Sequence, residues 1–274
     1  MLSILLGCGF VIIASVGASV GLIFQKKAHA NPPVLMNLEW WTGIIIATLA
    51  SITDSVALIF IRTSTIAVLA CISIPINVIV SGRLLKETTT TKQRMYLTAA
   101  TVGILVAILA VPHNTPSPND LEFFTRSQTI TALLIVSCAW IATLTIEQLL
   151  PDRNPFFYAI MAGISGAQFL TYGTAAIHTG HIIINVTQTI SIAIMALLSL
   201  LAHVYTLNVA LASGDAIPVT TTFQCTWCVA NILHGIFIFN DLKNGDPIRI
   251  SIFALGVLFT LLATVGAQYH RSTK

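Results

Sequence analysis

A single carboxylate lies deep inside an apolar stretch of this sequence, and carboxylates can bind cations or protons. Of the ten acidic residues, only Asp54 stands well away from the ends of the long apolar runs. A charged side chain at the centre of a membrane helix costs ~2.5–3.5 kcal/mol and marks a functional site by default. On a helix Thr48, Ser51, Asp54 and Ser55 share one face, because they are three or four residues apart. The pattern predicts a cation or proton site; the alternative is a protonated Asp54 bonded to a neighbouring hydroxyl.

Amides and further acids occur twice at one fixed separation. The stretch "NVIVSGRLLKE" runs from Asn77 to Glu87, and "NILHGIFIFND" runs from Asn231 to Asp241, 154 residues later. Mg²⁺ prefers oxygen ligands and sheds water reluctantly, so one carboxylate with amide and hydroxyl oxygens around a hydrated ion is a reasonable site. The alternative is that these polar groups only bond one helix to another. We predict a cation pathway with Asp54 as the metal ligand, together with Ser51, Asn77, Asn208, Gln224 and Asn231.

Glu87 and Asp241 each close one of these stretches, at the C-terminal end of a predicted helix. The helix macrodipole disfavours an anion there. We therefore predict that the two acids act as gates or tie their helices to neighbouring ones. Simple solvation at the membrane interface is the alternative.

The elements that hold these residues must be membrane helices. Of the 274 residues, 55% are hydrophobic and 8% are charged, against about 25% charged in an average soluble domain, and the mean hydropathy is +0.88. Apolar runs of about 20 residues are long enough to span a bilayer as helices. We predict an all-α, polytopic membrane protein with about nine transmembrane helices, at 2–24, 41–61, 64–85, 95–111, 129–150, 156–177, 188–211, 216–239 and 248–268.

The distribution of Lys and Arg predicts the orientation, because cytoplasmic loops carry an excess of both. With the N-terminus outside and the C-terminus inside, nine of the 13 cations lie on the inner side. These nine are Lys26, Lys27, Arg83, Lys86, Lys92, Arg94, Arg153, Arg271 and Lys274. The net charge of +3 gives no indication of a nucleic-acid partner; the expected surrounding is the lipid bilayer.

The separation of 154 residues extends beyond the two quoted stretches. At that offset Asp54 aligns with Asn208, and one residue less brings Gly103 onto Gly256. The second, third and fourth predicted helices thus match the seventh, eighth and ninth, and each partner crosses the membrane in the opposite direction. Such inverted repeats are the architecture of many secondary transporters; the alternative is an old duplication that serves only as scaffold. We predict a first repeat at 1–111, a connector with an extra helix at 112–150 and a second repeat at 151–274.

The stretch "WWTGIIIATLASITDSVALIFIRTSTIAVLACISIPINVIVSGRLLKE" ends at Glu87 and resembles the NIPA-type magnesium transporters of the drug/metabolite transporter superfamily. The likeness lies in the Trp-Trp start, the tight hairpin and a closing helix that ends in Leu-x-Glu. "GLIFQKK" is similar to the family's Lys-rich exit from its first helix. "LNVALASGDAIPVTTTFQCTWCVANILHGIFIFND" looks like its second hairpin, with Asp241 replacing the usual Glu. The sequence departs from the family at Ser51, where Glu is typical, and at Asp54, where Asn is typical.

The resemblance implies a transporter for a divalent cation, Mg²⁺ above all, that works by alternating access, needs no cofactor and is not an enzyme. Two other functions stay open. The chain could carry a small organic solute, or it could be a transport-silent structural subunit of a larger membrane complex. A homodimer or a larger membrane complex is a further expectation. A central cavity would favour transport over the structural role.

Overall fold

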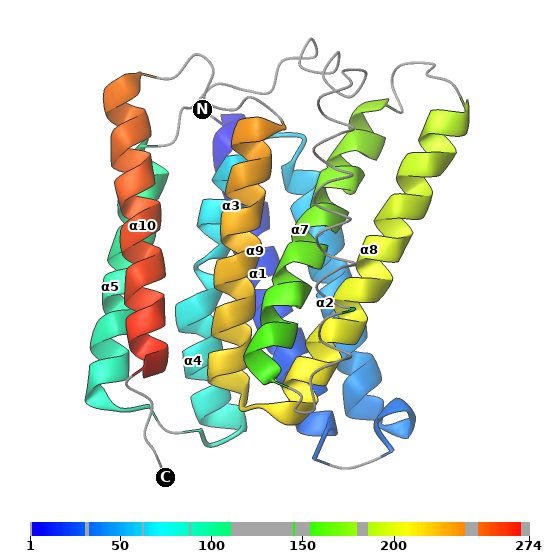
Figure 1. Cartoon of the computed structure of the whole chain (residues 1–274), viewed down its shortest axis with the longest axis vertical. Coiled ribbons are helices and arrows are strands. Elements are labelled where there is room, and N and C mark those ends of the chain that lie inside the picture. The colour runs from blue at the N-terminus through cyan, green and yellow to red at the C-terminus, as the bar shows by residue number, and fades with distance from the viewer. Residues whose placement is uncertain are drawn as a thin grey trace.

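The computed structural model describes residues 2–30, 33–61, 63–87, 89–110, 145, 154–179, 186–238 and 246–269. Every element in these ranges is helical, which confirms the prediction of an all-α protein. In chain order the elements are α1 (Leu2–Ala28), η1 (Val34–Met36), α2 (Leu38–Ala57), α3 (Thr63–Ala70), α4 (Ser73–Leu84), α5 (Thr91–Ala110), α7 (Pro155–Thr179), α8 (Val186–Ser213), α9 (Ala216–Phe237) and α10 (Pro247–Tyr269). They stand side by side in one bundle (Figure 1).

Several helices within the described ranges are suited to a membrane. Five segments are long and apolar enough to cross one: Ile4–Ala28, Leu38–Ala57, Thr65–Leu84, Ile192–Ser213 and Pro247–Ala267. They expose many leucines and isoleucines, as helices that face lipid do. These five segments support a membrane-embedded protein. Of the run predicted at 129–150, the structure describes only residue 145, which is helical.

The first two helices, α1 and α2, form a closely packed antiparallel pair. A Cβ on Gly43 would lie 2.6 Å from the carbonyl oxygen of Gly21, and a Cβ on Gly21 would lie 2.7 Å from that of Gly43. Only glycine fits at such a separation, and small residues are what allow membrane helices to approach this closely. The pair forms one side of the candidate site.

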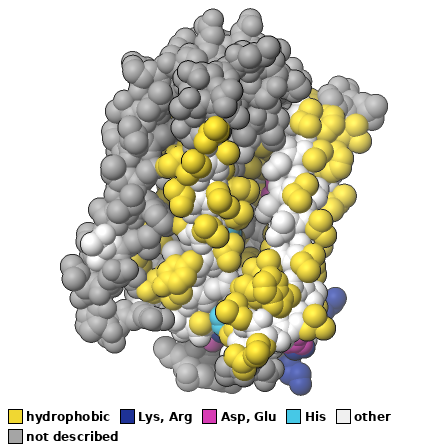
Figure 2. All heavy atoms as spheres, turned by 90° about the vertical axis from the view of Figure 1, so that its right-hand side faces the viewer, with side chains coloured by type: hydrophobic (Ala, Val, Ile, Leu, Met, Phe, Trp, Pro, Cys, Tyr) yellow, Lys and Arg dark blue, Asp and Glu magenta, His cyan; other side chains and the backbone are white. Residues whose placement is uncertain are grey.

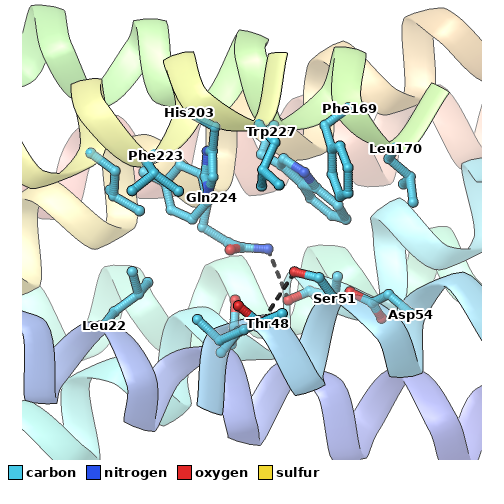
Figure 3. A pocket seen from close by; sticks show the side chains of 18 of the residues that line it. Leu22, Thr48, Ser51, Asp54, Phe169, Leu170, His203, Phe223, Gln224 and Trp227 are labelled. Carbon is cyan, nitrogen blue, oxygen red and sulfur yellow. Dashed lines mark hydrogen bonds between the residues drawn. The ribbon is translucent and has the colours of Figure 1, made fainter. Parts of the chain in front are cut away.

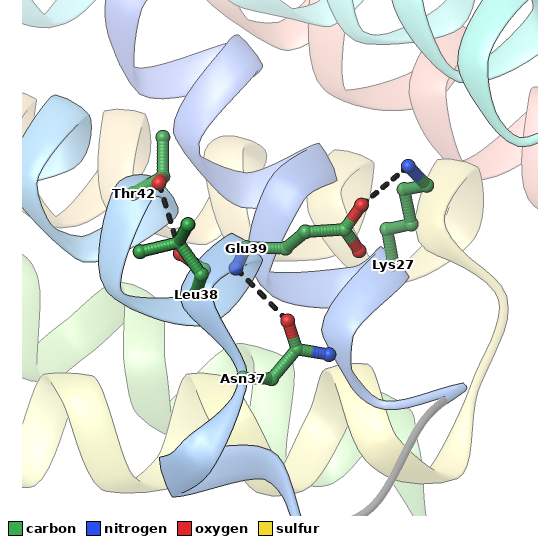
Figure 4. A network of polar contacts seen from close by, with 5 residues as sticks. All are labelled: Lys27, Asn37, Leu38, Glu39 and Thr42. Atoms are coloured by element: carbon green, nitrogen blue, oxygen red, sulfur yellow. Dashed lines mark hydrogen bonds and ion pairs between the residues drawn. The ribbon is translucent and has the colours of Figure 1, made fainter.

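The turn between α1 and α2 is held by polar contacts (Figure 4). Asn37 caps α2, since its side-chain oxygen accepts a hydrogen bond from the backbone N–H of Glu39 at 2.9 Å. The carboxylate of Glu39 in turn pairs with Lys27 at the end of α1. Because this ion pair is largely exposed, it stabilises the turn by no more than ~1 kcal/mol.

The run predicted as one helix at 64–85 is divided into α3 and α4. The cause is Pro75, which has no N–H to donate to the carbonyl of Cys71 and whose ring clashes with that carbonyl. The Cys71 carbonyl accepts instead from the N–H of Ile74, at 3.0 Å. The chain therefore makes a short turn at residues 71 and 72 before the helix resumes.

The other helices pack around this divided segment. In Figure 1, α1 ends, α2 begins and α8 turns into α9 at the bottom of the view, which we call the lower end. Helices α3 and α4 run towards the lower end and pack against α9, which runs away from it. Helix α7 packs against α8 and α9, and α5 packs against α10. In the last pair, a Cβ on Gly103 would lie 2.9 Å from the carbonyl oxygen of Gly256.

Candidate functional site

A cavity of about 210 Å³ separates α1 and α2 from α7, α8 and α9. Its lining extends along α1 from Ser15 to Gln25 and along α2 from Ile44 to Ser55. At a rise of 1.5 Å per residue, each of these stretches is about 15 Å long. The cavity is therefore an elongated slot, with one wall on each side (Figure 3).

The wall formed by α2 offers oxygen atoms to the cavity. All four residues predicted to share one helix face line it, and Asp54 is the one carboxylate among the lining residues. The Oδ1 atom of Asp54 is buried and has no hydrogen-bond partner in the described part of the chain. Thr48, Ser51 and Ser55 donate their protons to backbone carbonyls four residues earlier, at 2.8–3.0 Å. Since these protons are engaged within the helix, the hydroxyls present only lone pairs to a ligand, and the wall suits a cation.

The opposite wall combines one amide with aromatic rings. The amide of Gln224 points into the slot towards α2 in Figure 3, and its Nε2 donates to the carbonyl oxygen of Ala70 at 3.2 Å. Phe169, Phe223 and Trp227 line the same side. Gln224 is a predicted pathway residue that the structure brings to the cavity, facing Asp54 and Ser51 across it.

His203 also belongs to this wall. Its Nδ1 lies 2.9 Å from the carbonyl oxygen of Ala162, and because a carbonyl can only accept, Nδ1 carries the proton. The imidazole ring lies against Phe223, with ring centroids 5.3 Å apart. The wall is thus mostly π-surface with two polar groups set into it.

Four side chains that we call the lower plug bond to one another at the lower end of the slot: Gln25, His29, Trp40 and Asn208. The Trp40 indole donates to the Asn208 side-chain oxygen at 2.7 Å, and His29 Nε2 lies 3.3 Å from the same atom. The Asn208 amide nitrogen lies 3.4 Å from Gln25 Oε1, which it faces as a donor. Burial lowers the pKa of His29 below its ordinary value of 6.5, the bond to Asn208 opposes this shift, and nearby Lys26 lowers it further. Asn208 therefore lies at the lower end of the slot and is not part of its lining.

Two charges hold the turn between α8 and α9 at the lower end; we call Lys26 and Glu87 the lower clamp. Lys26 donates to the carbonyl oxygens of Leu211 and Gly214, at 2.8 and 2.7 Å. The two oxygens of Glu87 accept from the first N–H groups of α9, at 2.9 and 3.0 Å. Each charge faces the helix end that its sign favours, a cation at the end of α8 and an anion at the start of α9. Glu87 therefore ties the end of α4 to α9, which is one of the two roles predicted for it.

The remaining predicted residues lie elsewhere. Asn77 and Asn231 are fully buried on α4 and α9, but neither lines the slot. Both polar atoms of the Asn77 amide are without a partner among the described residues, whereas Asn231 donates to the Trp227 carbonyl at 2.9 Å. Asp241 lies outside the described residues.

In the part of the chain that the structure describes, no three His, Cys, Asp or Glu side chains gather with metal-binding geometry. A cation in the slot would meet one carboxylate, Asp54, and would complete its shell with neutral oxygens and water.

Sequence reasoning missed Gln25, His203, Lys26 and the aromatic wall. Gln25 and His203 carried a usable signal, since a polar side chain inside an apolar run was the argument that singled out Asp54. The aromatic residues carried no such signal, because Phe and Trp are ordinary in membrane helices.

No protein-family model, curated protein or solved structure matches this chain. Any function assigned to the chain therefore rests on the geometry of the slot.

Proposed function

We propose that this chain is a membrane transporter that carries a cation through the slot, with Mg²⁺ as the first candidate. The observation that carries the proposal is the buried Oδ1 of Asp54, which faces a cavity and has no partner among the described residues. An intramembrane carboxylate is costly unless something compensates its charge, and a bound cation does so. The cavity also favours transport over a structural subunit, for which no central cavity is expected.

The size of the slot suits a hydrated ion. Its 210 Å³ corresponds to about seven water molecules, at ~30 Å³ each. Mg²⁺ keeps several of its six octahedral ligands as water when one or two carboxylates bind it. Asp54 could contact the ion or its water shell from one wall, with Ser51 beside it and Gln224 on the other wall.

Alternating access between inverted repeats is the mechanism we propose. Support comes from residues that the sequence offset makes equivalent and that meet in the structure. Gln224 donates to the carbonyl of Ala70, 154 residues away, and Gly103 contacts Gly256, 153 residues away. A pseudo-twofold axis in the membrane plane produces such contacts, because a residue near the axis lies next to its own equivalent.

The lower clamp supplies the gate in this scheme. Lys26 and Glu87 both come from the first proposed repeat, and both hold the α8–α9 turn of the second. With the clamp formed, the slot is closed at the lower end. To open that end, the α8–α9 turn must break its hydrogen bonds with Lys26 and Glu87. In this scheme Glu87 acts as a gate by releasing the start of α9.

Mg²⁺ flux into proteoliposomes tests the proposal, with Asp54→Asn as the decisive variant. Asparagine has nearly the same size and removes only the charge, so we expect flux to fall at least ~10-fold, the loss of ~1.4 kcal/mol of interaction with the ion. Glu39→Gln is the matched control, because it makes the same chemical change on the same helix, outside the slot. Equal flux in the wild type and Asp54→Asn would exclude Asp54 from the pathway. An inactive wild type would reject Mg²⁺ transport itself.

A further inference from the structure

The slot also opens sideways, between α2 and α8. Figure 2 shows this face of the molecule hollowed between two ridges of hydrophobic side chains. Helices α2 and α8 flank the hollow; they meet at the lower plug, where Trp40 bonds to Asn208, and no extensive packing joins the rest of their described residues. Ile52 of α2 lines the slot and is nevertheless 56% exposed, so the slot reaches the surface at that point.

The rim of this opening is apolar. Ile45 and Leu49 on α2, and Leu197 and Leu201 on α8, are each more than half exposed. Both helices are long and apolar enough to cross a membrane, so these side chains face hydrocarbon. A fully hydrated ion would lose its water on entering from that side, which is unfavourable, whereas an amphipathic molecule already partitions into the bilayer. The opening therefore selects for a different ligand from a hydrated metal ion.

The interior of the slot fits a cation that also carries an apolar surface. Asp54 supplies one carboxyl group on the α2 wall, and Phe169 and Trp227 supply aromatic faces on the opposite wall (Figure 3). A cation over an aromatic face gains ~0.5–2 kcal/mol, and quaternary ammonium ions are bound this way. The volume of 210 Å³ is below the ~300 Å³ at which drug-sized ligands begin, so the ligand must be small.

We propose that the slot binds a small aromatic or aliphatic quaternary ammonium ion, which enters from the bilayer between α2 and α8. The inference uses the same site as the proposed function, but it does not require that Mg²⁺ be the cargo. The ammonium group lies between Asp54 on one wall and the aromatic faces of Phe169 and Trp227 on the other. Entry of the ligand from the bilayer thus depends on the exposed residues between α2 and α8, whereas its binding inside the slot depends on Asp54, Phe169 and Trp227.

Binding of tritiated benzyltrimethylammonium to the purified protein in nanodiscs tests the inference. We expect saturable binding that Asp54→Asn weakens at least ~10-fold, a factor equal to ~1.4 kcal/mol. Glu39→Gln should leave binding unchanged. Asp54→Glu keeps the charge and should keep measurable binding, which separates loss of charge from loss of fold. Neopentylbenzene, the neutral carbon isostere, should fail to compete.

The entry route is tested by association rates. Ile52→Trp narrows the opening and should slow association several-fold, whereas Leu255→Trp, on the exposed face of α10 and outside the lining, should not. Equal rates in both variants would overturn the lateral route. Absence of binding, equal binding in Asp54→Asn or competition by neopentylbenzene would overturn the inference. Mg²⁺ flux without ammonium binding would support the proposed function and reject the ammonium site. Ammonium binding without any Mg²⁺ flux would support the ammonium site and reject Mg²⁺ transport.

Discussion

Replacement of Glu87 by alanine tests the lower clamp. The two carboxylate oxygens accept from the N–H groups of Ala216 and Ile217, at 2.9 and 3.0 Å. A hydrogen bond to a charged group contributes ~1.5–3 kcal/mol, and an anion at a helix N-terminus adds ~0.3–1 kcal/mol. Water can replace part of this, because Glu87 is only half-buried. We therefore expect Glu87→Ala to lower the free energy of unfolding by roughly 2–4 kcal/mol, and Glu87→Gln by about half as much, since one acceptor oxygen remains.

The assay is thermal unfolding of the purified protein in detergent, where ~1 kcal/mol corresponds to about 2–4 °C in a chain of a few hundred residues. Glu39→Ala is the control, because it removes a carboxylate from an exposed ion pair worth at most ~1 kcal/mol. Lys26 and Glu87 hold the same turn, and the effects of such neighbouring residues are not additive. The double variant Lys26→Met with Glu87→Ala should therefore lose less stability than the sum of the two single variants. If Glu87→Ala is no more destabilising than Glu39→Ala, the clamp does not hold α9.

Three further predictions concern orientation, packing and pH. Met36→Cys at the lower end should react with an impermeant thiol reagent only from the inner side, and Ile248→Cys at the opposite end only from the outer side; labelling of both from one side would refute the predicted orientation. Gly256→Ala should destabilise the protein, because its Cβ would lie 2.8 Å from a backbone nitrogen of α5, whereas Gly173→Ala has open space and should be neutral or stabilising by up to ~1 kcal/mol; equal melting temperatures would contradict the close approach of α5 and α10. Since the folded-state pKa of His29 is lowered, the unfolded chain binds its proton first as pH falls below the ordinary value of 6.5, so stability should fall there in the wild type and less in His29→Gln; parallel pH profiles of melting temperature would exclude His29.

The residues on α2 were the part of the site that sequence could predict. Asp54 and Ser51 are on one helix, where local spacing alone decides which side chains share a face, and both line the slot. The prediction that the elements are membrane helices also needed only local information, namely the apolar composition and length of each run. The break at residues 71 and 72 was also within reach, because Pro75 is visible in the sequence and its effect on the preceding turn is local.

Contacts between distant helices could not be predicted in this way. Gln224 reaches the slot and Asn231 does not, although both are amides on one face of α9. The difference depends on how α9 is rotated against α4 and α7, which side-chain packing decides and periodicity does not. The partner of Glu87 was hidden for the same reason, since the N-terminus of α9 lies 129 residues further along the chain.

Asp54 and Asn208 occupy equivalent positions in the two proposed repeats but would have different roles in transport. The offset makes them equivalent, yet Asp54 faces the slot while Asn208 bonds Trp40 in the lower plug. If the two repeats exchange conformations during transport, the plug around Asn208 must open as the slot around Asp54 closes. An amide releases a cation more readily than a carboxylate, because it has no charge to separate from it. A carboxylate at the site of capture and an amide at the site of release would then favour movement of the cation towards the lower end, and Asn208→Asp should slow release by retaining the cation there.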